Sequence, residues 1–214
     1  MMQLRRRLGL LLRCALAAML GCALAGCSLS RPSPVKDTYL LQASLPKQAI
    51  ATPRPAALKV GTIAVAAPFR GKALVYREGD LKYETDFYNE FLVSPSAMLT
   101  ESASAWLAAD HVFQDVLPAS ANADGDYVLE GFVSEFYGDF REGARPVAVI
   151  TVKFFLVDNR SSSGVPMWQT QLTQRAPISS RNAGALVGGF DSAWTAILVD
   201  LTRQLESLQL PTAK

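Results

Sequence analysis

The residue of this 214-residue sequence with the clearest chemistry is Cys27, which ends the stretch Leu24-Ala25-Gly26-Cys27. A thiol can pack as a small hydrophobe, form a disulfide or be modified covalently. The other two cysteines, Cys14 and Cys22, lie in the apolar segment that precedes it. If that segment is removed, Cys27 has no disulfide partner, and a leftover cysteine in an exported chain indicates another use of its thiol.

The segment before Cys27 has the layout of a secretory signal. Four arginines (Arg5, Arg6, Arg7 and Arg13) precede an apolar run from Cys14 to Ala25 that ends in small residues. A membrane-spanning helix needs about 20 uninterrupted apolar residues, and Arg13 interrupts this run too early. Removal of residues 1–26 changes the formal net charge from +2 to −2, because four positive charges and no negative ones are lost. A nucleic-acid partner therefore has no electrostatic basis.

Leu24-Ala25-Gly26-Cys27 resembles the lipobox of bacterial lipoproteins. The resemblance implies cleavage between Gly26 and Cys27, and acylation of both the thiol and the new amino terminus. Two or more acyl chains anchor a protein stably to a membrane without a spanning helix. Ser28 follows where an inner-membrane retention signal would place Asp, so the resemblance implies the periplasmic face of the outer membrane. The alternative is an ordinary secretory signal that leaves a free thiol.

Other residues give little indication of chemistry. His111, next to Asp110 at a predicted helix end, is the only histidine. A spatially assembled triad stays an alternative, but interaction with the helix dipole is favoured. The glycine-rich stretch Gly184–Gly189 lacks the lysine of a phosphate loop and fits a helix start or hinge. Asp139 and Glu142 flank a predicted turn, and we expect both to be solvated. We therefore predict no enzyme, no metal site and no cofactor beyond the covalent lipid.

The sequence after Cys27 predicts a flexible tether over 27–37 and a single α+β domain over 38–210. Alternating apolar residues predict strands, and apolar residues at helical spacing predict two helices. Residues 127–174 predict a three-strand antiparallel meander, and we expect an antiparallel sheet with both helices on one face. The strands are predicted at 38–41, 58–65, 73–76, 81–84, 112–117, 127–136, 147–157 and 167–174, and the helices at 94–110 and 190–208.

Aromatic residues raise the question of a ligand cage or a binding edge. Trp106 and Trp194 fall on the apolar faces of the predicted helices, so core packing is favoured for both. Trp168 lies in a predicted strand and could face either way. The apolar stretch Phe87–Val93 could be an exposed binding edge, but a buried strand is the favoured interpretation.

The order of these features resembles the ABC-type transport auxiliary lipoprotein family, the PqiC-like outer-membrane lipoproteins. The resemblance covers Cys27 to about Leu208 and lies in the lipobox and the segments TYLL, LKVGTIAVAAP, LVYREGDLKY, HVFQDVL, DYVLEGFVSEF, FFLVD and FDSAWTAILVDLTRQL. It implies an accessory protein that docks to or bridges a lipid-transport system, with a periplasmic MCE-domain protein or another transporter subunit as partner. The alternative is a lipoprotein that binds a lipid or small ligand alone. The sequence leaves open whether the domain forms a homo-oligomer.

Overall fold

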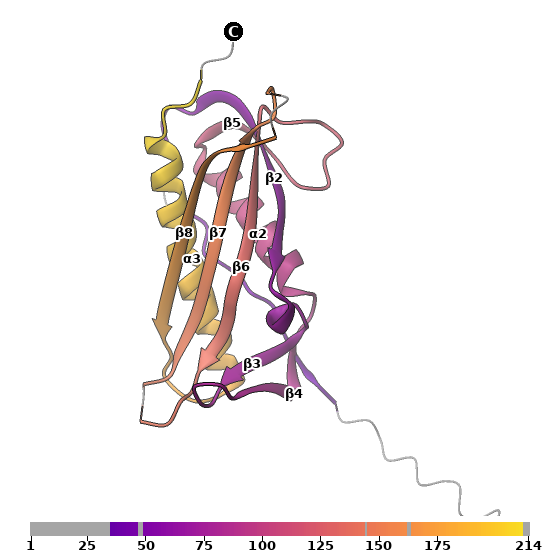
Figure 1. Ribbon diagram of the computed structural model, residues 1–214, viewed down its shortest axis with the longest axis vertical. Coiled ribbons are helices and arrows are strands. Elements are labelled where there is room, and N and C mark those ends of the chain that lie inside the picture. Colours follow the sequence, from indigo (N-terminus) through magenta and orange to yellow (C-terminus); the bar gives the residue numbers. More distant parts are fainter. Residues whose placement is uncertain (1–34, 47–48, 144, 162–163, 212–214) are drawn as a thin grey trace, which may run out of the picture. The chain divides into compact units, whose positions relative to one another are not determined.

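A computed structural model describes residues 35–46, 49–143, 145–161 and 164–211 of the chain. The predicted signal peptide and the cleavage and lipidation site, Gly26 and Cys27, lie outside the described residues. Residues from Lys36 onward form one compact unit, shown in Figure 1. Its strands are β1 Asp37–Tyr39, β2 Arg54–Val65, β3 Ala73–Arg77, β4 Tyr83–Phe91, β5 Phe113–Leu117, β6 Tyr127–Asp139, β7 Val147–Asp158 and β8 Pro166–Pro177, and its helices are η2 Ala67–Phe69, α2 Pro95–Asp110 and α3 Ala183–Ser207.

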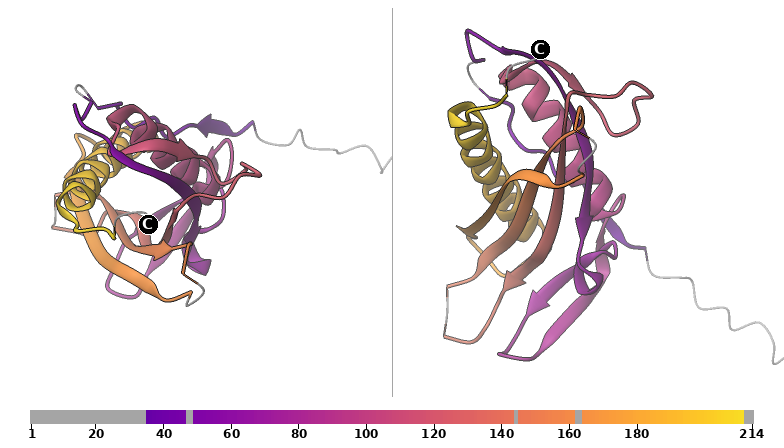
Figure 2. Two further views of the ribbon diagram at one scale, coloured as in Figure 1. Left: turned by 90° about the horizontal axis from the view of Figure 1, so that it is seen from above. Right: turned by 45° about the horizontal axis from the view of Figure 1, so that its top comes forward.

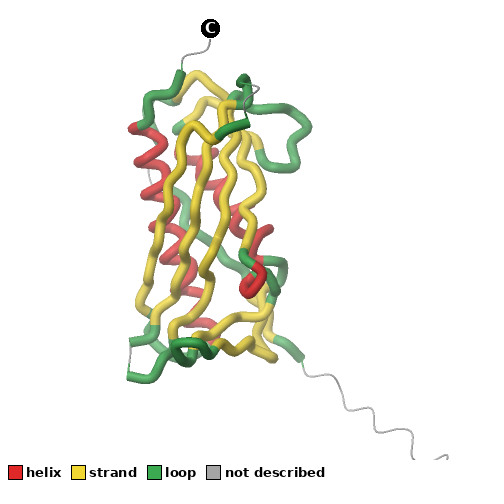
Figure 3. The backbone as a smooth tube through the Cα atoms, viewed as in Figure 1, coloured by secondary structure: helices red, strands yellow, loops and turns green. Residues whose placement is uncertain are grey.

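The predicted meander is confirmed as β6, β7 and β8, which pair antiparallel along almost their whole length. Two strands pair with the side of β6 that is opposite β7. Its first half pairs with β2, which in turn pairs with β5, and its last two residues pair with β3, which leads to β4 and β1. Figure 3 shows the long strands side by side, with the short ones at the two ends of β6.

The α+β class is confirmed, but the sheet is mixed and not antiparallel throughout as expected. The pairs β1–β4, β2–β5, β2–β6 and β3–β6 are parallel. Antiparallel neighbours can be joined by a tight turn, whereas parallel neighbours need a longer connection. The antiparallel pairs here follow one another directly in the sequence, and the parallel pairs are separated by other elements.

Both helices lie on one face of the sheet, as expected (Figure 2). The hydroxyl of Ser94 accepts a hydrogen bond from the Ala97 amide, and Pro95 opens α2, so this helix begins at the predicted residue. Asn182 caps α3 in the same way through the Ala185 amide. The predicted apolar stripe extends from Phe190 to Leu205 within a helix that begins earlier than expected.

The core lies between the helices and the sheet, and the predicted tryptophans are part of it. Trp194 and Trp106 are buried, and their indole N–H groups donate to Ser102 and Thr202 on the opposite helix at 3.2 and 3.1 Å. Trp168 is half-buried on β8. By length and composition α3 could cross a membrane, but half of its most apolar stretch is buried within this fold. Its apolar residues are thus explained by core packing.

Candidate functional site

The lone histidine lies at the helix end, where the sequence places it. His111 is the C-cap residue of α2, exposed, with a left-handed backbone at φ 61°. Asp110, its neighbour, is buried inside the fold. Among the described residues, no group of three or more His, Cys, Asp or Glu could hold a metal ion. The expectations that the chain is not an enzyme and holds no metal stay predictions. The side-chain networks and pockets of the described residues are features that can bind a partner or stabilise the fold.

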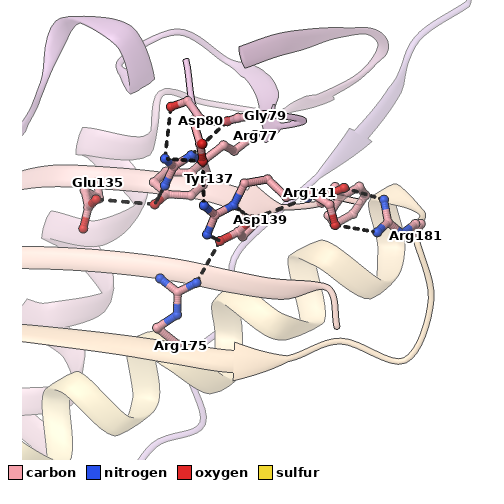
Figure 4. Close-up of polar contacts among 10 residues, drawn as sticks. Arg77, Gly79, Asp80, Glu135, Tyr137, Asp139, Arg141, Arg175 and Arg181 are labelled. Atoms are coloured by element: carbon pink, nitrogen blue, oxygen red, sulfur yellow. Dashed lines mark hydrogen bonds and ion pairs between the residues drawn. The ribbon is translucent and has the colours of Figure 1, made fainter. Parts of the chain in front are cut away.

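Asp139 is the centre of an ion-pair network at one end of the sheet (Figure 4). Arg141 Nε and Nη2 lie 3.0 Å from its two carboxylate oxygens, and Arg175 Nη2 lies 2.8 Å from Oδ2. Hydrogen bonds from Arg141, then from Arg175, outweigh the effect of burial and lower the pKa of Asp139 to about 2. Arg141 also reaches Asp80 in the β3–β4 turn at 3.1 Å. The network therefore ties β6, β8 and the β3–β4 hairpin together.

The expectation that Asp139 and Glu142 are both solvated is wrong for Asp139, which is 2% exposed, and Glu142 alone is exposed. Asp139 is the last residue of β6, next to Gly138, where an added Cβ would lie 3.0 Å from the Leu186 side chain of α3. Successive side chains alternate between the faces of a strand, so Asp139 points away from the helices. On that face Arg141 and Arg175 cover the carboxylate. The position of Asp139 next to a predicted turn does not reveal that these arginines are its partners.

A cluster of aromatic rings lies beside this network on the same face of the sheet. Tyr137 packs edge-on against Tyr83 and is tilted against Phe69. The Arg77 guanidinium lies over both tyrosine rings, at 5.7 Å from the centroid of Tyr83 and 6.0 Å from that of Tyr137. Arg77 also donates to the carbonyls of Gly79 and Asp80 in the hairpin turn. The β3–β4 hairpin is therefore fixed to the sheet by both ion pairs and ring contacts.

A bulge in β4 presents two aromatic side chains to solvent. Ala73 of β3 lies opposite Glu90, but Val75 lies opposite Thr85, so residues of β4 are left over between these pairs. We call the segment Asp86–Asn89 the aromatic bulge. Within it Phe87 and Tyr88 are 62% and 59% exposed and pack edge-to-face, with ring centroids 5.1 Å apart. The favoured interpretation of this stretch as a buried strand is wrong, because the bulge breaks the alternation that would bury every second residue.

Asp86 holds the bulge in shape. Its carboxylate accepts hydrogen bonds from the Tyr76 hydroxyl at 2.7 Å, the Tyr88 and Asn89 amides at 2.9 Å, and the Asn89 side chain at 3.0 Å. Burial raises the pKa of Asp86, but these bonds outweigh it and the pKa is lowered overall. Asn89 also accepts a hydrogen bond from Tyr39 on β1. The aromatic bulge is thus bonded to both neighbouring strands.

An open pocket of about 650 Å³ lies behind the aromatic bulge. Its lining includes Tyr39, Tyr76 and Asp86 from the hydrogen-bond network, and Asn182 and Gly184 from the start of α3. A second cavity of about 320 Å³ lies between the helices against Trp106 and Asp110. Both are within the size range of small-molecule sites. The arrangement offers exposed surfaces and pockets that can bind a partner or ligand. The sequence pattern does not indicate where these pockets lie.

Comparison with known proteins gives one family match. Residues 39–202 match the family described as ABC-type transport auxiliary lipoprotein component. No curated protein matches the sequence.

Two solved structures have the same fold. A Xanthomonas campestris protein of family DUF330 is 19% identical with a TM-score of 0.68, over 80% of this chain and 99% of its own. An uncharacterized protein is 17% identical with a TM-score of 0.63, over the same shares. PelC from Paraburkholderia phytofirmans, crystallised as a dodecamer, is 23% identical over 71% of this chain and 92% of its own, with a TM-score of 0.41.

Proposed function

The chain belongs to the family of ABC-type transport auxiliary lipoprotein components, and from this membership we propose that it is an accessory protein of a lipid-transport system, anchored by a lipid on Cys27. It is held at the periplasmic face of the outer membrane. There it docks to or bridges a periplasmic MCE-domain protein or another transporter subunit. Hydrolysis of ATP takes place elsewhere in such a system, so this chain needs no catalytic residues.

The observation that carries the proposal is the family match over nearly the whole compact domain, together with the position of the lipobox before it. The match begins at residue 39, and the compact unit begins at Lys36. Cys27 therefore precedes the domain by a short linking segment. This is the arrangement of a domain tethered to a membrane by its amino terminus.

The anchor is tested by labelling cells with a fatty-acid analogue. Wild-type protein should take up the label and Cys27→Ala should not. Cys22→Ala is the matched control, because Cys22 lies in the segment that is cut away, and it should be labelled like the wild type. Equal labelling of wild type and Cys27→Ala would rule out this anchor. Separation of inner and outer membranes then tests the location.

The partner is tested by purification from membranes in mild detergent. The protein should bring down an MCE-domain protein or a permease subunit, and recovery of abundant envelope proteins alone would count against the proposal. Genes for a permease, an ATPase and an MCE-domain protein beside the gene for this chain would support it.

The second candidate function is that of a lipoprotein that binds a lipid or small ligand without a protein partner. The pocket of about 650 Å³ behind the aromatic bulge favours it, because this volume suits a small ligand. Native mass spectrometry of the purified protein tests this candidate. A bound lipid or metabolite would support it, and a mass equal to that of the lipidated chain alone would count against it.

A further inference from the structure

We propose that the aromatic bulge, Asp86–Asn89, is a membrane-contacting element that seats the domain on the bilayer carrying its lipid anchor. The lipid surface would receive Phe87 and Tyr88, together with Leu81 from the turn of the same hairpin. This inference rests on the proposed anchor at Cys27 and adds an orientation to it.

The first argument is the place where the chain enters the fold. β1 runs parallel to β4, and Asp37, the first residue of β1, lies opposite Asn89 of the bulge. The preceding Lys36 lies with its Nζ 5.9 Å from the centroid of the Phe87 ring. The chain that leads back to Cys27 therefore leaves the domain beside the aromatic bulge. In Figure 1 β1 lies next to the β3–β4 hairpin, at the lower end of the sheet.

The second argument is the short distance that the chain between Cys27 and Asp37 can span. Cys27 and Asp37 are ten residues apart in the sequence. Ten residues span at most about 35 Å when fully extended, and about 17 Å on average as a flexible chain. With Cys27 in the bilayer, the surface around Asp37 is kept within this distance of the headgroups. The aromatic bulge is thus among the parts of the domain held nearest the membrane.

The third argument is the chemistry of the exposed side chains. Single exposed apolar residues are common on soluble proteins, but here three belong to one hairpin. Leu81 in its turn is 97% exposed, and Phe87 and Tyr88 in the aromatic bulge are exposed as well. Aromatic rings with an apolar body and a polar tip are favoured at the membrane interface. The four hydrogen bonds that Asp86 accepts, one of them from Tyr76, fix the pair in its projecting position.

The proposal is tested with the full-length lipidated protein in vesicles of phosphatidylethanolamine and phosphatidylglycerol, with plain or brominated acyl chains. Bromine quenches only tryptophans that reach the acyl chains. The reporter is Phe87→Trp, with Tyr88→Trp as a second reporter, and the emission of wild type is subtracted. Phe132→Trp is the matched control, because Phe132 is an exposed aromatic residue on β6. Brominated lipid should quench the added emission at position 87 or 88 and not at 132.

The outcomes separate this inference from the anchor. If the protein floats with the vesicles but brominated lipid leaves the emission at 87 and 88 unchanged, the anchor stands and the membrane contact is overturned. In that case co-purification decides the role of the aromatic bulge. If a transporter subunit co-purifies with wild type and not with the double variant Phe87→Ser/Tyr88→Ser, the aromatic bulge is a protein-docking surface. If the wild type does not float, the anchor itself has failed, and the inference falls with it.

Discussion

Arg175 on β8 lies 2.8 Å from Asp139 on β6, so this ion pair reaches across the strand β7 that separates them. Arg141, two residues after Asp139, closes the other side of the same carboxylate and continues to Asp80 in the β3–β4 turn. The hairpin that carries the aromatic bulge is thereby connected to the edge strand β8. Two strands and a turn that are separated in the sequence are thus joined through one buried acid.

Asp139→Asn should lower the free energy of unfolding by about 2 kcal/mol at pH 7, because the ordinary pKa of 3.8 is lowered to about 2 in the fold. A lowered pKa contributes stability above pH 4, and this contribution is lost as the pH falls from 3.8 toward 2. In urea unfolding the gap between wild type and variant should therefore narrow below pH 4, by about half at pH 3, and nearly close at pH 2. The control, Glu142→Gln, changes an exposed acid and should follow wild type, and a gap as large at pH 3 as at pH 7 would contradict the prediction.

Tyr76→Phe should destabilise the fold by about 1 kcal/mol, because it removes the hydrogen bond that holds Asp86 in the aromatic bulge. Burial, and then the bond to Asp86, raise the pKa of Tyr76 well above its ordinary value of 10.0. The stability that follows is present below pH 10 and is lost as the pH rises further, so wild type should lose stability above pH 10 faster than the variant. Chemical denaturation across this range measures both effects. Tyr88→Phe, on an exposed ring, should match wild type.

Two neighbouring glycines of α3 should respond in opposite ways to alanine. A Cβ on Gly189 would collide with the Ile178 side chain and lie 2.8 Å from Ala148 Cβ, so Gly189→Ala should destabilise by about 1–3 kcal/mol. A Cβ on Gly188 would meet nothing within 4 Å, and Gly188→Ala should stabilise by about 0.5–1 kcal/mol through helix propensity. Thermal melts should move in opposite directions, and equal shifts would mean that α3 does not pack on β7 as described.

Asp110→Asn should stabilise the domain by about 1 kcal/mol. Asp110 Oδ2 is buried without a hydrogen-bond partner among the described residues, and the acid lies in the last turn of α2, where the helix dipole disfavours negative charge. Glu101→Gln makes the same acid-to-amide change on an exposed site of that helix and should leave stability nearly unchanged. A drop in melting temperature for Asp110→Asn would show that the carboxylate has an important partner.

The elements that the sequence predicted well are those set by neighbouring residues. Ser94 and Pro95 specify the start of α2, because the cap and the first helical position need only local geometry. The meander from β6 to β8 follows from alternating residues and short turns. Core positions such as Trp194 follow from helical spacing.

The parts that the sequence could not predict depend on contacts between distant residues. The parallel pairing of β2 with β6 joins segments separated by three strands and the helices η2 and α2, and no local pattern encodes it. The burial of Asp139 depends on Arg175, which lies on another strand and is distant in the sequence. The exposure of Phe87 and Tyr88 follows from the extra residues of β4 in its pairing with β3.

The sequence by itself determined the α+β class, the start of α2, the candidate lipid site at Cys27 and the resemblance to a transport auxiliary lipoprotein. Each of these depends on adjacent residues or on a short periodic pattern of apolar residues. Only the tertiary structure decided which strands are parallel, which acids are buried and which aromatic rings face solvent beside the first strand. These depend on register and burial, which exist only once segments far apart in the chain are packed together.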